Sequence, residues 1–149
     1  MQVRKATLLD TSPILVLLAE MHTEPEQQLD KVNWPKVSHI VVQCISNGSV
    51  FVAIDETNLI VGSIGGDKTT EWYSDVAKLA DYWFYVLKDH RNTPAGFSLM
   101  KEFKKLAQEA SLGLTVGHVL GYEIDRMDRF YTKLGFTKTG TLFSLEGAI

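Results

Sequence analysis

The chain has 149 residues, of which 45% are hydrophobic and 22% are charged, so a single globular domain over residues 1–149 is expected, not a disordered segment or a coiled coil. A net charge of −3 and a pI of about 5.8 argue against general affinity for nucleic acid. No apolar run approaches the ~20 residues that a membrane-spanning helix needs, so we expect no membrane partner.

The first part of the chain predicts a strand, two helices and a β-hairpin. Pro13 is suited to the first turn of a helix, with Thr11 or Ser12 as its cap, and Asn47-Gly48 is a helix stop signal. In chain order the expected elements are a strand over Arg4–Leu8, a helix from within Asp10–Pro13 to about His22, a helix over Trp34–Ile45, and hairpin strands over Val50–Ile54 and Leu59–Ile64. The glycines that follow, Gly62, Gly65 and Gly66, predict a bulge or kink in the second hairpin strand, not a phosphate loop.

The only cysteine, Cys44, lies in the second predicted helix. A single cysteine excludes an internal disulfide and fits a reducing compartment, and an apolar helical context favours a core position over a nucleophile. The residues Met1–Lys5 lead into strand and helix signals and do not resemble a signal peptide. We therefore expect a cytoplasmic protein.

The central segment predicts a strand, a basic turn and an amphipathic helix. An apolar run, Tyr82–Leu87, is followed by the basic stretch Lys88–Arg91 and the small-residue turn Asn92–Gly96. Thr93 is a suitable N-cap with Pro94 at the first helical position, and the helix is expected to stop at Gly113. Free N–H groups and the helix dipole at such a start favour an anion, so the turn can hold a phosphate. The alternative is an ordinary strand–helix unit.

The last part of the chain predicts a strand, a helix and two further strands. Met127, Phe130, Tyr131 and Leu134 form one apolar helical face, and Gly135 supplies a left-handed C-cap. The strands are expected over Leu114–Leu120, Phe136–Lys138 and Thr141–Leu145, with Gly140 as a turn between the last two.

The four histidines show no metal-ligand spacing, so no metal site is expected. His22, His39, His90 and His118 are scattered and lack C-x-x-C or H-x-x-x-H partners. Neither a Walker A motif nor a G-x-S-x-G motif is present.

Two segments resemble the GNAT (N-acetyltransferase) superfamily. Arg91–Gly96 resembles the Q/R-x-x-G-x-G/A turn of its motif A, and Asp128–Phe136, DRFYTKLGF, resembles the end of its motif B. The order of predicted elements is also the GNAT order. The resemblance implies an α/β (α+β) GNAT fold, with a mixed central sheet of about six to seven strands flanked by about four helices. The short chain is also similar to small GNAT proteins of phage genomes.

The resemblance implies acetyl-CoA as cosubstrate. The strand residues Tyr85, Val86 and Leu87 would pair with its pantetheine arm. The turn and first helical residues would bind its pyrophosphate; these are Arg91, Asn92, Thr93, Ala95, Gly96 and Phe97. Pro94 stands where the family has a glycine and removes one N–H donor. Ile124 stands where the family often has a cofactor-contacting asparagine.

The resemblance also implies a division of catalytic roles. Tyr131 would protonate the departing thiolate, because a phenol with an ordinary pKa near 10 is protonated at pH 7. Backbone N–H groups near Tyr85–Leu87 would polarise the thioester carbonyl. Asp81, at the start of the central strand, is the first choice for the base; the other candidates are Asp67, Glu71 and His118.

The expected function is therefore N-acetyl transfer from acetyl-CoA to a primary amine of a small molecule or a protein. The alternative is a GNAT-fold protein that binds CoA or a protein partner without turnover, motivated by Pro94 and Ile124. A third hypothesis is an unrelated α/β protein whose turn fits motif A by chance. The family often forms homodimers, which leaves a homodimer open for this chain.

Overall fold

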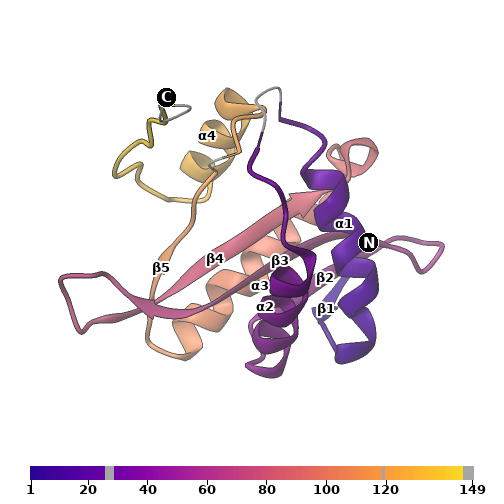
Figure 1. Cartoon of the computed structure of the whole chain (residues 1–149), viewed down its shortest axis with the longest axis horizontal. Coiled ribbons are helices and arrows are strands. Elements are labelled where there is room, and N and C mark those ends of the chain that lie inside the picture. The colour runs from indigo at the N-terminus through magenta and orange to yellow at the C-terminus, as the bar shows by residue number, and fades with distance from the viewer. Residues whose placement is uncertain (26–28, 119, 146–149) are drawn as a thin grey trace.

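The computed structural model describes residues 1–25, 29–118 and 120–145, which form one sheet with helices on both faces (Figure 1). The strands are β1 Gln2–Lys5, β2 Val50–Ile54, β3 Ile60–Thr70, β4 Ala77–Val86 and β5 Gly113–Thr115. The α-helices are α1 Thr11–Met21, α2 Trp34–Ser46, α3 Ala95–Glu109 and α4 Ile124–Lys133. Short 3₁₀ turns lie at Leu8–Asp10 and Lys88–His90.

The strands follow one another across the sheet in sequence order, β1-β2-β3-β4-β5. The pairs up to β3–β4 are antiparallel, and β4–β5 is parallel, so the sheet is mixed as expected. The parallel pair needs a crossover, and α3 supplies it. The mixed α/β fold predicted from the sequence is confirmed.

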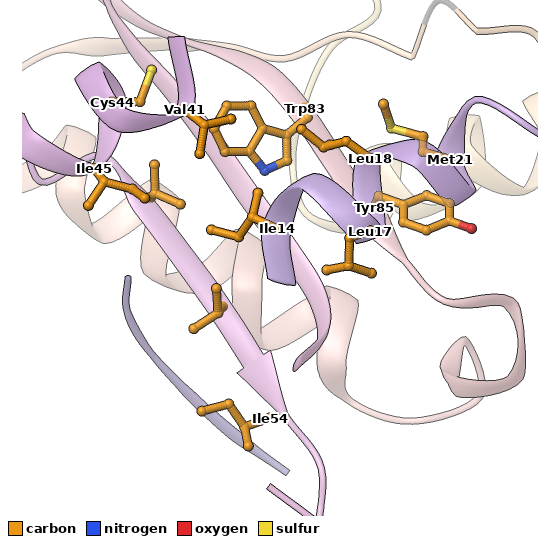
Figure 2. Close-up of a cluster of buried hydrophobic side chains, with 12 residues drawn as sticks. Ile14, Leu17, Leu18, Met21, Val41, Cys44, Ile45, Ile54, Trp83 and Tyr85 are labelled. Atoms are coloured by element: carbon orange, nitrogen blue, oxygen red, sulfur yellow. The ribbon is translucent and has the colours of Figure 1, made fainter. Parts of the chain in front are cut away.

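Two hydrophobic cores lie on opposite faces of the sheet. In the first, α1 and α2 cover Trp83, Tyr85 and the inward residues of β2. Figure 2 shows Ile14 and Val41 beside the Trp83 ring, with Tyr85 next to Leu17 and its hydroxyl pointing away from the other side chains. Cys44 belongs to this core, as predicted, and burial raises the pKa of its thiol to about 12.

The second core lies under α3, whose buried residues recur along one face. These residues are Ala95, Leu99, Met100, Phe103 and Ala107. They pack against the other face of β2, β3 and β4, including Phe51, Ile64 and Val86. Alternate residues of β4 therefore belong to different cores, which holds this strand between two helical layers.

A β-bulge interrupts the pairing of β3 and β4. Gly65 pairs with Trp83 and Gly66 pairs with Asp81, so Tyr82 is the extra residue on β4. A Cβ added to Gly66 would lie 1.8 Å from the carbonyl oxygen of Ala80, so only glycine fits at this crossing. The bulge predicted from these glycines is confirmed.

The two strands predicted at the C-terminal end are wrong. Phe136–Lys138 and Thr141–Leu145 form no strand, and within the described ranges the sheet has five strands, not six to seven. The neighbour available to them, β5, is itself only three residues long. Local strand propensity without a ladder partner does not form a sheet. The side chains of Phe143 and Leu145 are 90% and 99% exposed.

Several predicted boundaries also move. The first strand begins and ends earlier than Arg4–Leu8, because residues 8–10 form a 3₁₀ turn that Asp10 closes by accepting from the Thr7 N–H. The second helix and the first hairpin strand match their predicted bounds within a residue. The strand predicted over Leu59–Ile64 continues to Thr70 as β3, and the strand predicted from Tyr82 begins at Ala77 as β4. Their paired ends form a long β3–β4 arm. The strand predicted over Leu114–Leu120 shortens to β5.

Candidate functional site

The site begins where β4 and β5 diverge. These strands pair only over Lys78–Ala80 and Gly113–Thr115, whereas β4 stays paired with β3 as far as Val86. Beyond Ala80 one edge of β4 therefore has no strand beside it in the described part of the chain. Figure 1 shows the two strands separating, with α4 beyond the point of divergence.

The open edge of β4 presents the backbone of Phe84 and Val86. Leu87 donates its N–H to the carbonyl of Val61 on β3, and backbone direction alternates along a strand. Phe84 and Val86 therefore face away from β3, and Val86 O accepts from Arg91 Nε at 2.9 Å. Of the backbone N–H groups predicted near Tyr85–Leu87 to polarise a thioester carbonyl, that of Leu87 is already bonded to Val61, and the role of this segment stays a prediction.

The turn after β4 leads into α3 with several of its N–H groups already used. Thr93 N–H donates to His90 O, and Ala95 N–H donates to Thr93 Oγ1 at 3.3 Å. The helix begins at Ala95, one residue later than predicted, with Pro94 as the cap residue. No acceptor is present among the described residues for the N–H groups of Asn92, Gly96 and Phe97. Unbonded N–H groups at the start of a helix are suited to an anion, as the sequence predicts for this turn.

Arg91 is the most heavily bonded side chain of the turn, and only 10% of it is exposed. Its guanidinium forms an ion pair with Glu24, binds Glu123 at 2.9 Å and donates to Val86 O. The rings of Tyr85 and Tyr122 lie 5.4 and 5.5 Å from it, within the range of cation–π attraction. Two carboxylates already neutralise this cation. Its predicted electrostatic help to a cofactor stays a prediction.

The charges of Arg91 and Glu24 and their burial shift the pKa values of the groups around them. Burial disfavours the Glu24 carboxylate, but hydrogen bonds from Arg91 and Tyr85 outweigh it and lower the pKa of Glu24. Burial, followed by the charge of Glu24, raises the pKa of Tyr122 to about 12. Glu24, Tyr122 and Glu123 were not predicted as site residues, since each is far from Arg91 in sequence and belongs to no motif.

Tyr131 lies on α4 among aromatic rings. The ring centroids of Phe130 and Phe136 are each 5.6 Å from it, and that of Phe84 is 6.5 Å away. Its hydroxyl is buried and has no hydrogen-bond partner among the described residues. A buried unpaired hydroxyl costs stability, so its presence at this position calls for an explanation beyond packing.

Asp81 lies close enough to Tyr131 for their charges to interact. Burial, and then the charge of Asp81, raise the pKa of Tyr131, so its phenol stays protonated at neutral pH. Burial also raises the pKa of Asp81 to about 6, although Gly117 N–H donates to Oδ1 at 3.1 Å and favours the carboxylate. The two residues predicted as catalytic therefore lie within electrostatic range of each other, and their roles as proton donor and acceptor stay predictions.

The other predicted bases are placed differently. Asp67 accepts from the Asn47 side chain at the root of the β3–β4 arm, and Glu71 lies near Lys78 toward the arm's tip. His118 contacts the carbonyl of Tyr122 through Nε2. Each has a local structural partner, as Asp81 has in the N–H of Gly117, but of these residues only Asp81 raises the pKa of Tyr131. Among the described residues no cluster of three or more His, Cys, Asp or Glu side chains could hold a metal ion.

The amino-acid sequence matches a known protein family. The model of the family described as acetyltransferase (GNAT) domain matches residues 46–138, more than half of the chain, from the end of α2 past α4. A search of curated protein sequences gives no match. No helix in residues 1–25, 29–118 or 120–145 is long and apolar enough to cross a membrane.

Solved structures share the fold at low sequence identity. An aminoglycoside 6′-N-acetyltransferase from Acinetobacter haemolyticus is 13% identical with a TM-score of 0.71, covering 100% of this chain and 99% of its own. An acetyltransferase from Trypanosoma brucei is 17% identical with a TM-score of 0.70, covering 97% and 98%. A ribosomal-protein-alanine N-acetyltransferase from Brucella melitensis is 13% identical with a TM-score of 0.67, covering 99% and 100%. At such identities the likeness shows the fold alone.

Proposed function

Because the chain belongs to the GNAT acetyltransferase family, we propose that it transfers an acetyl group from acetyl-CoA to a primary amine of a small molecule or a protein. The observation that carries this proposal is the buried hydroxyl of Tyr131, which has no hydrogen-bond partner among the described residues and whose pKa the charge of Asp81 helps to raise. The solved structures of this fold include enzymes named for an aminoglycoside and for a ribosomal-protein alanine, both of which offer an amine.

The residues of the turn fit a CoA pyrophosphate. Asn92, Gly96 and Phe97 offer N–H groups at the start of a 15-residue helix, whose dipole favours an anion. A Cβ on Gly96 would lie 3.6 Å from the Phe84 ring, so the turn approaches the open edge of β4 closely. When bound, acetyl-CoA supplies the acetyl thioester that is transferred.

The protein groups supply proton transfer and polarisation. Asp81, as a carboxylate above pH 6, accepts the proton that the amine loses as its nitrogen bonds the acetyl carbon. Tyr131 donates its phenolic proton to the sulfur as the carbon–sulfur bond breaks. Backbone N–H groups on the open edge of β4 stabilise the charge that develops on the carbonyl oxygen. Both protons are accounted for, since water restores Tyr131 and removes the proton from Asp81.

The experiment is a panel of primary amines incubated with the protein and acetyl-CoA, with release of the free CoA thiol as the signal. In parallel, acetyl-CoA should raise the melting temperature, because it binds only the folded chain. A protein that gives no thermal shift at millimolar acetyl-CoA does not have the proposed activity. The panel identifies the acceptor class by the amines that accelerate thiol release.

The second candidate is a GNAT-fold protein that binds CoA or a protein partner without turnover. It is motivated by the turn itself, where Pro94 has no N–H and that of Ala95 is bonded to Thr93. A thermal shift with acetyl-CoA and no thiol release with any amine supports this candidate over the first.

A further inference from the structure

The helix that carries Tyr131 has little to fix its position in the core. None of the residues of α4 is fully buried, and its contacts with the sheet are the partly buried side chains Phe130, Tyr131 and Leu134. A helix without buried residues depends on contacts at its ends to hold one orientation. Lys104 Nζ donates to Leu134 O at 3.0 Å at the C-terminal end of α4, so the groups at its N-terminal end supply the other fixed point of the helix.

Those groups form a closed ring with the turn after β4. Arg91 Nη1 binds Glu123 Oε2 at 2.9 Å, and Arg126 Nη1 lies 3.7 Å from Glu123 Oε1. Arg126 Nη2 then donates to the backbone carbonyl of Arg91 at 2.8 Å. The first turn of α4 is thus joined at both the side chain and the backbone to the residue that begins the proposed pyrophosphate turn.

The backbone of Glu123 has an unusual conformation, which indicates that the ring has a functional role. Glu123 has φ +47° and ψ +41°, the left-handed conformation that side chains other than those of Asn, Asp and His seldom adopt. Such strain persists where the surroundings hold it, and it gathers at functional sites. Here the ion pairs of Glu123 with Arg91 and Arg126 supply the holding contacts.

We propose that the Arg91–Glu123–Arg126 ring is a positioning device, which transmits occupancy of the pyrophosphate turn to α4 and so orients the Tyr131 hydroxyl. The inference rests on the proposed function, because it takes the turn to be the CoA site. Arg91, Glu123 and Arg126 act through Tyr131 and do not contact the reacting atoms. When the cofactor fixes the turn in one conformation, the contacts of the ring also fix the start of α4.

Hydrogen exchange tests the coupling with coenzyme A alone as the probe, so no acceptor is needed. In the wild-type chain, saturating coenzyme A should slow exchange in the turn, residues 87–97, and also in α4, residues 124–133. Arg91→Lys keeps the charge but loses the fork that reaches several acceptors at once. Glu123→Asn removes the charge while tolerating the left-handed backbone. Both variants should lose protection of α4, and Glu123→Asn, which leaves the proposed pyrophosphate residues unchanged, should keep protection of the turn.

The control is Asp125→Asn, which removes a carboxylate from the same first turn of α4. Asp125 lies on the exposed side of the helix, so its variant should keep protection in both segments. Protection of α4 in Arg91→Lys and Glu123→Asn equal to that of the wild type overturns the inference alone. Absence of protection at residues 87–97 in the wild type overturns the proposed function, and the inference with it.

A double-mutant cycle adds a kinetic readout that a merely structural role would not give. Arg91→Lys should lower the rate of amine-dependent thiol release by about tenfold, within the usual range of coupling between sites. In a Tyr131→Phe background the same change should have little further effect, because the ring acts through that hydroxyl. Full additivity of the two substitutions contradicts the inference.

Discussion

At the scale of single residues, Tyr131 and Asp81 are the two residues proposed to carry the chemistry. The phenol is buried without a partner, and the nearby carboxyl has its pKa raised by burial to about 6. A pair whose environments keep the phenol protonated while the carboxyl ionises near neutral pH divides proton donation and acceptance between its members. Each member of the pair can be tested separately.

Tyr131→Phe should lower the rate of thiol release by about 100-fold, within the range for loss of a general acid. The melting temperature should stay the same or rise slightly, because the change removes a buried hydroxyl that lacks a partner and keeps the ring among Phe84, Phe130 and Phe136. The affinity for acetyl-CoA should change little. Stopped-time thiol assays measure the rate, and thermal melts measure the melting temperature. An unchanged rate means that Tyr131 is structural.

Asp81→Asn should change how stability depends on pH. The pKa of Asp81 rises from an ordinary 3.8 to about 6 on folding, so between these values the folded chain binds more protons than the unfolded chain. Ionisation of Asp81 therefore costs stability as the pH rises through this window, and the cost is complete above it. Removing the carboxylate should stabilise the protein at pH 7.5 by roughly 1–3 kcal/mol.

The stability difference between Asp81→Asn and the wild type should shrink as the pH falls toward 4, where Asp81 is protonated in the folded chain and partly protonated in the unfolded chain. Urea unfolding of both chains at a series of pH values from 4 to 7.5 measures this difference. A difference that does not vary with pH contradicts the assignment of a raised pKa to Asp81. The variant should also release CoA thiol more slowly with any accepted amine.

The sequence predicted Tyr131 and Asp81 but missed the residues around Arg91. Tyr131 lies in a recognisable motif, and Asp81 begins an apolar strand, so both have a local signal. Glu24 and Glu123 meet Arg91 only in the folded chain and from opposite directions along the sequence. Neither the α1–α2 segment nor the start of α4 carries a motif that predicts such a contact.

At the scale of elements, β4 organises the site through its bulge and its open edge. The bulge follows from glycines that the sequence displays, whereas the open edge depends on how far β5 pairs, which no local pattern shows. The C-terminal strands failed for the same reason. Residues 136–145 have strand propensity but do not pair with β5 or with the open edge of β4, and pairing is a tertiary property.

Gly66→Ala tests the bulge. The added Cβ would lie 1.8 Å from the Ala80 carbonyl oxygen, so the arm must shift, and a loss of about 1–3 kcal/mol of stability is expected. Gly113→Ala on β5 is the control, because its Cβ would meet only the Lys78 side chain at 3.7 Å. Equal melting temperatures for the two variants would contradict the close approach at Gly66.

At the scale of the whole molecule, β4 packs between two hydrophobic cores, and the candidate site lies at its end. The family match starts at residue 46, so α1 and nearly all of α2 lie outside it, although they cover one face of the sheet. Glu24, which follows α1, also lies outside the match. The part of the chain outside the family match thus borders the site, and we expect acceptor choice to depend on it.

The central claim is that the turn between β4 and α3 binds acetyl-CoA, and calorimetric titration tests it most directly. Asn92→Asp places a carboxylate on an exposed residue beside the free N–H groups, and Gln108→Glu adds the same charge near the other end of α3. Repulsion between the new carboxylate and the pyrophosphate should weaken acetyl-CoA binding about tenfold in Asn92→Asp. Binding by Gln108→Glu should match the wild type. Equal affinity in all three chains would contradict the account.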